Sequence, residues 1–186
     1  MTASLSFSFY DVTVPLFVHE LGALSSILKK GAGHAEARKI DPVVFLQGRL
    51  APDMFPLVRQ VQIATDQAKG GAARLAGLEP PRFEDTEASF PELEDRIART
   101  ISFLSGLERR AFAEALSRTI RLPQRERTVE LPALAYLQGY VLPNFFFHTT
   151  TAYAILRHLG VEIGKMDFLG LARTEDLAHG LPLPKR

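Results

Sequence analysis

The run Pro143-Asn144-Phe145-Phe146-Phe147-His148, which continues to Gly160 as TTTAYAILRHLG, decides how this chain is interpreted. Its apolar residues recur at helical spacing, yet a polar Asn144 and a titratable His148 lie four residues apart within it. Side chains at this spacing share one face of a helix, so we expect both to point towards the core. The run therefore predicts a helix that carries a polar site, or the remains of one, inside a helical bundle.

Composition excludes several classes of protein. The chain has 186 residues, of which 46% are hydrophobic, enough for one substantial core. Its formal net charge of +1 gives no field that favours nucleic acid, and the absence of cysteine rules out disulfides and thiolate chemistry. No stretch approaches the roughly 20 apolar residues of a membrane span, and the first residues make a poor signal peptide. We expect a cytoplasmic protein without a nucleic-acid or membrane partner.

Apolar periodicity predicts four long helices. They cover about residues 11–30, 53–75, 90–104 and 132–159, with a short helical turn at 43–47. Ser89 and Glu92 form the pattern of a capping box at the start of the third helix. Pro143 lies inside the fourth helix and predicts a kink one turn before His148, where backbone groups are left for side chains to satisfy.

A change of period precedes the last helix. Between Thr119 and Leu131 apolar residues alternate with charged ones around a polar centre, which predicts a short β-hairpin. Four amphipathic segments without a strand-helix alternation indicate an all-α fold, an antiparallel four-helix bundle with that hairpin before the last helix. We expect a single domain over residues 1–170 and an irregular tail over 171–186.

Polar residues on the inner faces of the predicted helices are the candidate site. Buried amides and imidazoles need partners, so these residues should meet one another, the backbone or water. The candidate ligand-binding residues are Asp53, Gln60, Tyr140, Asn144, His148 and Thr151. Two interpretations stay open: a pocket for a small ligand or a metal, or a satisfied hydrogen-bond network around the Pro143 kink.

Metal and catalytic motifs give no support for a specific reaction. Zinc and nickel sites usually need three or more His, Cys or carboxylate ligands, whereas the other histidines, at 19, 34, 158 and 179, are scattered. No glycine-rich phosphate loop, nucleophile elbow or HExxH pattern is present. We therefore expect neither a bound metal nor a cofactor, and whether the protein is an enzyme stays open.

Three segments carry a resemblance to a known family. They are the last predicted helix ending in Leu156-Arg157-His158-Leu159-Gly160, the segment 51–57 (APDMFPL) followed by Gln60-Val61-Gln62, and the closing 164–170 (GKMDFLG). Together with the opening helix, these segments resemble the DinB/YfiT-like four-helix bundles, in a branch of uncharacterised function. The resemblance covers nearly the whole chain.

The resemblance implies a site as well as a fold. Members of that superfamily typically carry a three-histidine metal site, and alignment of the Leu-Arg-x-Leu-Gly ends places His148, Asn144 and Gln60 at or near its three positions. Only one histidine of the three remains, and amides are poor ligands for zinc or nickel, so the resemblance implies a degraded metal site. Some members are thiol-dependent transferases or isomerases, which keeps an enzymatic role open.

Two functional interpretations compete. In the first, the protein binds a small molecule near His148, whose imidazole has a pKa near neutrality and exchanges a proton while the amides orient the ligand. In the second, it is a noncatalytic structural or dimerisation module in which the same residues only satisfy the kinked helix. Three consecutive aromatics, Phe145 to Phe147, point in three directions, so one is available for a contact between copies, and we expect a homodimer.

Overall fold

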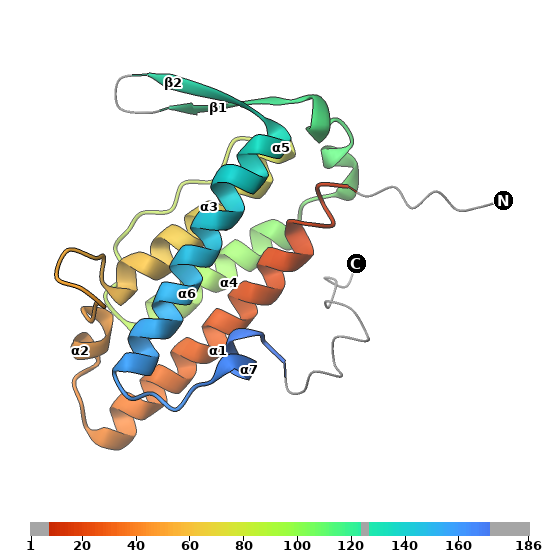
Figure 1. The fold of residues 1–186 in the computed structure, drawn as a ribbon. Helices are drawn as coiled ribbons and strands as arrows, with labels where there is room; N and C mark the ends of the chain where they lie inside the picture. The colour runs from red at the N-terminus through yellow and green to blue at the C-terminus, as the bar shows by residue number, and fades with distance from the viewer. Residues whose placement is uncertain (1–7, 124–126, 172–186) are drawn as a thin grey trace.

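Four long helices form the body of the protein in this computed structural model, which describes residues 8–123 and 127–171. They are α1 (Val14–Arg38), α3 (Leu57–Leu75), α4 (Phe90–Ser105) and α6 (Leu142–His158). Figure 1 shows them side by side, with a hairpin at one end of the bundle and short helices at its edges. This arrangement confirms the predicted all-α bundle with a hairpin before the last helix.

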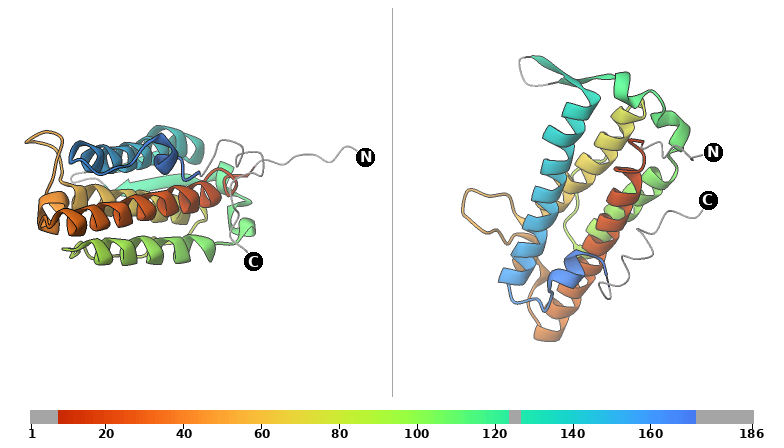
Figure 2. Two further views of the ribbon diagram at one scale, coloured as in Figure 1. Left: turned by 90° about the horizontal axis from the view of Figure 1, so that it is seen from below. Right: turned by 45° about the vertical axis from the view of Figure 1, so that its right-hand side comes forward.

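Neighbouring helices of the bundle include both antiparallel and parallel pairs. α1 and α4 run antiparallel, as do α3 and α6, and these are the two most extensive helix contacts. α3 and α4 run in the same direction, because the connection over residues 76–89 returns along the bundle between them. Figure 2 shows α1 and α4 in neighbouring layers beneath α6. The α3–α6 contact brings two distant segments of the sequence together.

Two helix boundaries differ from those that the sequence predicts. α1 continues past Lys30 to Arg38, since Gly31 lies within the helix where α6 and α4 approach closely. A Cβ atom at Gly31 would lie 3.1 Å from Leu156 and 3.3 Å from Phe90, so this glycine marks a close contact and not a stop signal. α3 begins at Leu57, later than predicted, because the preceding residues form a turn closed by the bond from Met54 N to the carbonyl of Ala51, 3.0 Å.

Shorter elements complete the chain. α2 (Pro42–Leu46) and the Ser89 cap of α4, which accepts from Glu92 N at 3.3 Å, are as predicted. After α4 come the 3-10 turns η1 (Arg109–Phe112) and η2 (Ala115–Ser117), and α7 (Lys165–Phe168) follows α6. The predicted irregular tail lies outside the described residues, apart from Leu171. No helix in the described part of the chain has the length and apolar character needed to cross a membrane.

The hairpin leads into a helix of mixed type. β1 (Thr119–Pro123) pairs antiparallel with β2 (Thr128–Pro132), and Ile120 faces Leu131. The chain then forms α5 (Ala133–Tyr136), the π-helical segment η3 (Leu137–Val141) and α6. Pro143 has no backbone N–H to donate to the preceding turn, which gives a physical reason for the change of helix type at the predicted kink.

Candidate functional site

His148 on α6 and Gln60 on α3 meet at the contact between these two helices. His148 Nδ1 and Gln60 Oε1 are 2.7 Å apart although 88 residues separate them in sequence. Both residues are buried, with exposures of 7% for His148 and 1% for Gln60. The structure thus brings together two of the residues that the sequence predicts as a site.

The hydrogen bond that Gln60 makes to Phe55 fixes the tautomer of the neutral His148 ring. Gln60 Nε2 donates to the carbonyl of Phe55 at 2.9 Å, and this bond turns Gln60 Oε1 towards His148. Because an amide oxygen only accepts, the hydrogen of the neutral His148 ring is assigned to Nδ1. The lone pair of the neutral ring is therefore on Nε2.

His148 Nε2 has no hydrogen-bond partner among the described residues. It is also not sealed in the core: within that part of the chain, Arg118 Nε is the one fully buried side-chain nitrogen or oxygen that lacks a partner. Nε2 therefore keeps contact with solvent, although only 7% of the surface of His148 is exposed. The arrangement presents one hydrogen-bond acceptor at the edge of the α3–α6 contact.

The environment of His148 favours its neutral form. Burial lowers the pKa of the imidazole below its usual 6.5, and the positive charge of Arg59 lowers the pKa further. Both effects disfavour the imidazolium, since burial removes hydration and a like charge repels it. The sequence predicts a pKa near neutrality for His148. In the structure the pKa of His148 is lower, because the ring is buried between α3 and α6 and lies near Arg59.

Two exposed aromatic rings accompany the pair. Phe147 packs edge-on against His148, with ring centroids 5.1 Å apart, and Phe147 and Phe55 are each 56% exposed. The guanidinium of Arg59 lies 5.9 Å from the centroid of the Phe55 ring and also pairs with Asp85. Large apolar side chains are usually covered, so two exposed rings beside a polar pair mark this surface as unusual.

The other predicted site residues are placed differently. Asn144 Nδ2 donates to the carbonyl of Tyr140, and Thr151 Oγ1 donates to the carbonyl of Phe147, both at 2.7 Å. Tyr140 is half-buried and stacks on Tyr136, with ring centroids 5.8 Å apart. Asp53 is exposed in the turn before α3. In the described part of the chain, none of these four side chains is hydrogen-bonded to His148 or Gln60.

The residues at the positions of the superfamily's three-histidine metal site do not fit a metal ion. Gln60 Oε1 accepts the His148 Nδ1–H, and Asn144 turns back to its own helix, where its Nδ2 donates to the Tyr140 carbonyl. Amides are also weak ligands for transition metals compared with imidazole. Over residues 8–123 and 127–171, no group of three or more His, Asp or Glu side chains is arranged to hold a metal.

A second polar cluster, which the sequence interpretation missed, lies between α3 and α4. Arg96 is completely buried, and each nitrogen of its guanidinium donates to at least one acceptor. The acceptors are Thr65 Oγ1 at 2.8 Å, Asp66 Oδ1 at 2.8 Å, Asp85 Oδ1 at 3.0 Å, the carbonyl of Glu84 at 3.0 Å and Glu87 Oε1 at 3.1 Å. This cluster anchors the 76–89 connection and, through Asp85, reaches Arg59. One feature of the sequence points to this cluster: Arg96 comes directly before Ile97, on the side of α4 that faces the core.

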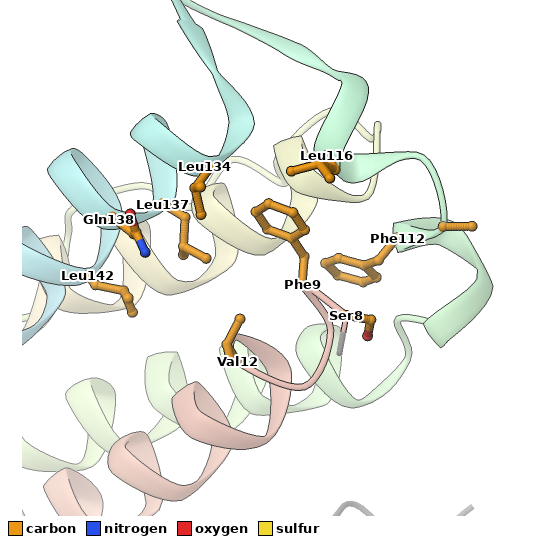
Figure 3. A pocket seen from close by; sticks show the side chains of 10 residues that line it. Ser8, Phe9, Val12, Phe112, Leu116, Leu134, Leu137, Gln138 and Leu142 are labelled. Carbon is orange, nitrogen blue, oxygen red and sulfur yellow. The ribbon is translucent and has the colours of Figure 1, made fainter. Parts of the chain in front are cut away.

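An apolar cavity of about 650 Å³ lies at the start of α6, and His148 is not among the residues that line it. Its walls include Phe9 and Val12 near the start of α1, Phe112 in η1, and Leu134, Leu137 and Leu142 from α5, η3 and α6. Figure 3 shows Leu134, Leu137 and Leu142 on one side of the space and Phe9, Val12 and Phe112 across from them. The polar side chains of its lining are Ser8 and Gln138. The sequence interpretation did not anticipate this cavity.

Comparisons with known proteins agree with this fold. The family described as a domain of unknown function, DUF1993, matches residues 9–169. A crystal structure of a DinB family member protein from Shewanella denitrificans is similar, with 44% sequence identity and a TM-score of 0.80 over 86% of this chain and 90% of that chain. This likeness confirms the resemblance to DinB-like bundles. No curated protein matches the chain.

Proposed function

The chain belongs to the DUF1993 family, and on that premise we propose that it binds a small molecule at His148, with Gln60 as the residue that orients the imidazole. The observation that carries the proposal is that His148 Nε2 has no hydrogen-bond partner within residues 8–123 and 127–171. Gln60 holds the ring so that this lone pair meets solvent, while burial and Arg59 keep the imidazole neutral by lowering its pKa. A neutral, oriented imidazole is an acceptor for a ligand hydroxyl, amide or ammonium hydrogen.

The surroundings indicate the chemical class of the ligand. Phe147 packs against His148, and Phe55 supplies the carbonyl that orients Gln60, so two residues with exposed aromatic rings adjoin the His148–Gln60 pair. Arg59 is already paired with Asp85, which reduces its value as a partner for an anion. We therefore propose a ligand with a flat or apolar body and one hydrogen-bond donor.

A noncatalytic structural module is the second candidate, and one observation favours it. Asn144 and Thr151 both turn back to carbonyls of their own helix, as polar residues do when they only satisfy a distorted turn. In this alternative the His148–Gln60 bond joins α3 to α6, and the protein binds no ligand there. A homodimer that uses the exposed Phe147 belongs to this alternative and stays a proposal.

Phenol and anisole test the first candidate directly. They have the same ring, but only phenol carries a donor hydrogen. In protein labelled with nitrogen-15 at histidine, we expect phenol to shift the His148 Nε2 resonance saturably, with a dissociation constant on the order of 1 mM, whereas anisole leaves it unchanged. The variant His158→Gln, on the exposed end of the same helix, should keep the response.

The same experiment identifies the structural alternative. If phenol leaves the His148 resonance unchanged up to its solubility limit, the ligand proposal is wrong. A structural role is then supported when His148→Gln lowers the free energy of unfolding, since Gln60 Oε1 loses the donor that it accepts from.

A further inference from the structure

The cavity at the hairpin end of the bundle has the properties of a small-molecule site. Its volume of about 650 Å³ lies within the range of about 300–1,000 Å³ that such sites occupy. Leu116 and Leu134 lie at its edge with 70% and 45% of their surfaces exposed, although leucine is normally covered. An apolar interior with apolar residues at the entrance is costly in water and is relieved when an apolar molecule enters.

The helix beside the cavity carries a second, independent feature. Leu137 and Gln138 belong to the π-helical segment η3, and Leu142 follows it directly. π-Helical turns are rare, and they occur frequently at functional sites because the extra residue redirects side chains. In Figure 3 the side chains of Leu137, Gln138 and Leu142 come from this stretch and border the cavity. The backbone irregularity and the cavity therefore coincide.

The charges near the cavity are neutralised by one another. Arg109 forms a bidentate pair with Asp11, and its Nη1 lies 3.3 Å from Ser8 Oγ at the cavity wall. The Ser8 hydroxyl itself donates to Asp11 Oδ2 at 3.0 Å. No charged side chain among the described residues lines the cavity, so a charged ligand would lose hydration without gaining a partner there. Of the two polar side chains in the described lining, Ser8 is already bonded to Asp11 and Arg109, whereas the Gln138 amide offers both a donor and an acceptor.

We propose that this cavity binds an uncharged, mostly apolar molecule with one polar group, which Gln138 recognises. The site is separate from the one at His148, which is not part of the lining. An alcohol, ketone or secondary amine on an aromatic or aliphatic body has this chemistry.

Two fluorescent probes with the same diarylamine skeleton test the proposal. N-phenylnaphthylamine is neutral and has one N–H, whereas anilinonaphthalenesulfonate adds a sulfonate. In a titration of the full chain, we expect saturable binding of one neutral probe per chain, and binding of the anionic probe at least about tenfold weaker. Gln138→Leu should weaken the neutral probe about fivefold by removing the acceptor for its N–H.

A filling substitution locates the binding site. Ala113 is exposed on the cavity wall, so Ala113→Trp occupies the cavity from its edge without changing the core, and the neutral probe should bind at least about tenfold more weakly. Ala37→Trp, on an exposed position at the far end of α1, is the matched control and should bind normally, as should His148→Gln. Non-saturable binding, equal affinity for Ala113→Trp and Ala37→Trp, or equal affinity for the two probes overturns the proposal. Because His148→Gln tests the other site, the two proposals fail independently.

Discussion

His148 donates its Nδ1–H to Gln60 Oε1 at 2.7 Å and so joins α6 to α3. The bond has two effects, because it closes the core between the helices and also fixes which ring nitrogen is free. Gln60 can take this role because its own amide is held by the carbonyl of Phe55. A chain of two hydrogen bonds thus connects the turn before α3 with the imidazole on α6.

The first prediction concerns the titration of His148. Its pKa in the folded protein is lower than 6.5, mainly through burial and secondarily through Arg59. In the window between the folded pKa and 6.5, the unfolded chain binds more protons than the folded one, so the free energy of unfolding falls as the pH is lowered through this window. Chemical denaturation at a series of pH values should show this fall in the free energy of unfolding. The fall should be smaller in His148→Gln, because the contribution of His148 is absent.

Arg59 provides the control for the origin of this pKa. Arg59→Gln removes the smaller cause and leaves the burial, so the pKa of His148 should rise towards 6.5 without reaching it. Nuclear magnetic resonance titration of the ring measures the pKa directly. An unchanged pKa in Arg59→Gln would show that burial alone sets the value.

The sequence predicts the His148–Gln60 pair but not the positions of the other candidate residues. Helical periodicity states which face a side chain occupies, and this was enough for two buried residues on facing helices. It does not state which acceptor a side chain selects, and Asn144 and Thr151 found a carbonyl one turn earlier on their own helix. Local acceptors compete with distant ones, and only coordinates resolve the competition.

Arg96 and Gly31 show two further limits of sequence interpretation. A charged residue beside apolar neighbours on a helix is normally assigned to the surface, yet Arg96 is buried because the 76–89 connection supplies its acceptors. A glycine after a helical run normally predicts a stop, yet Gly31 lies inside α1 at a close contact. Both depend on tertiary packing, whereas the bundle and hairpin follow from local patterns.

Glu20 gives the second prediction. It lies on α1 with 9% exposure, and burial raises the pKa of its carboxyl above 4.5, an effect that the charge of His19 partly offsets. The folded state therefore favours the protonated form of Glu20. The free energy of unfolding falls as the pH rises from 4.5 to the higher pKa of the folded state, and it levels off once the carboxyl is ionised in both states. Glu20→Gln should be more stable than the wild type at neutral pH in urea denaturation. The difference should shrink on acidification below 4.5, and a difference independent of pH would contradict the assignment.

The third prediction concerns the buried arginine. Arg96→Met leaves Asp66, Asp85 and Glu87 without their shared cation, and the side chain of Glu87 is only 4% exposed. Removing one partner of a buried charge cluster costs about 3–5 kcal/mol, which urea denaturation will measure. Arg96→Lys keeps the charge but not the planar fork of donors, so it should recover only part of this loss.

Arg99 is the matched control for Arg96. It also lies on α4 and pairs with Asp95 at 2.8 Å; its Nη2 reaches Glu87 Oε1 of the cluster only at 3.8 Å, and 48% of its side chain is exposed. Exposed ion pairs contribute at most about 1 kcal/mol, so Arg99→Met should change stability by no more than that. Equal losses in Arg96→Met and Arg99→Met would mean that the buried network has no special role.

The last prediction uses two adjacent glycines of α3. A Cβ atom at Gly71 would lie 2.5 Å from Val141 Cγ1, whereas one at Gly70 would meet only the flexible end of Arg74, at 2.8 Å from Nη1. Gly71→Ala should therefore cost about 1–3 kcal/mol through overpacking against η3, despite the gain in helix propensity. Gly70→Ala should be neutral or stabilising by up to about 1 kcal/mol, since only the propensity gain applies.

In the double variant Gly71→Ala/Val141→Ala the clash is absent, so a double-mutant cycle should give a favourable coupling of about 0.5–3 kcal/mol. Additive losses in that cycle would show that Gly71 is not required by the approach of Val141.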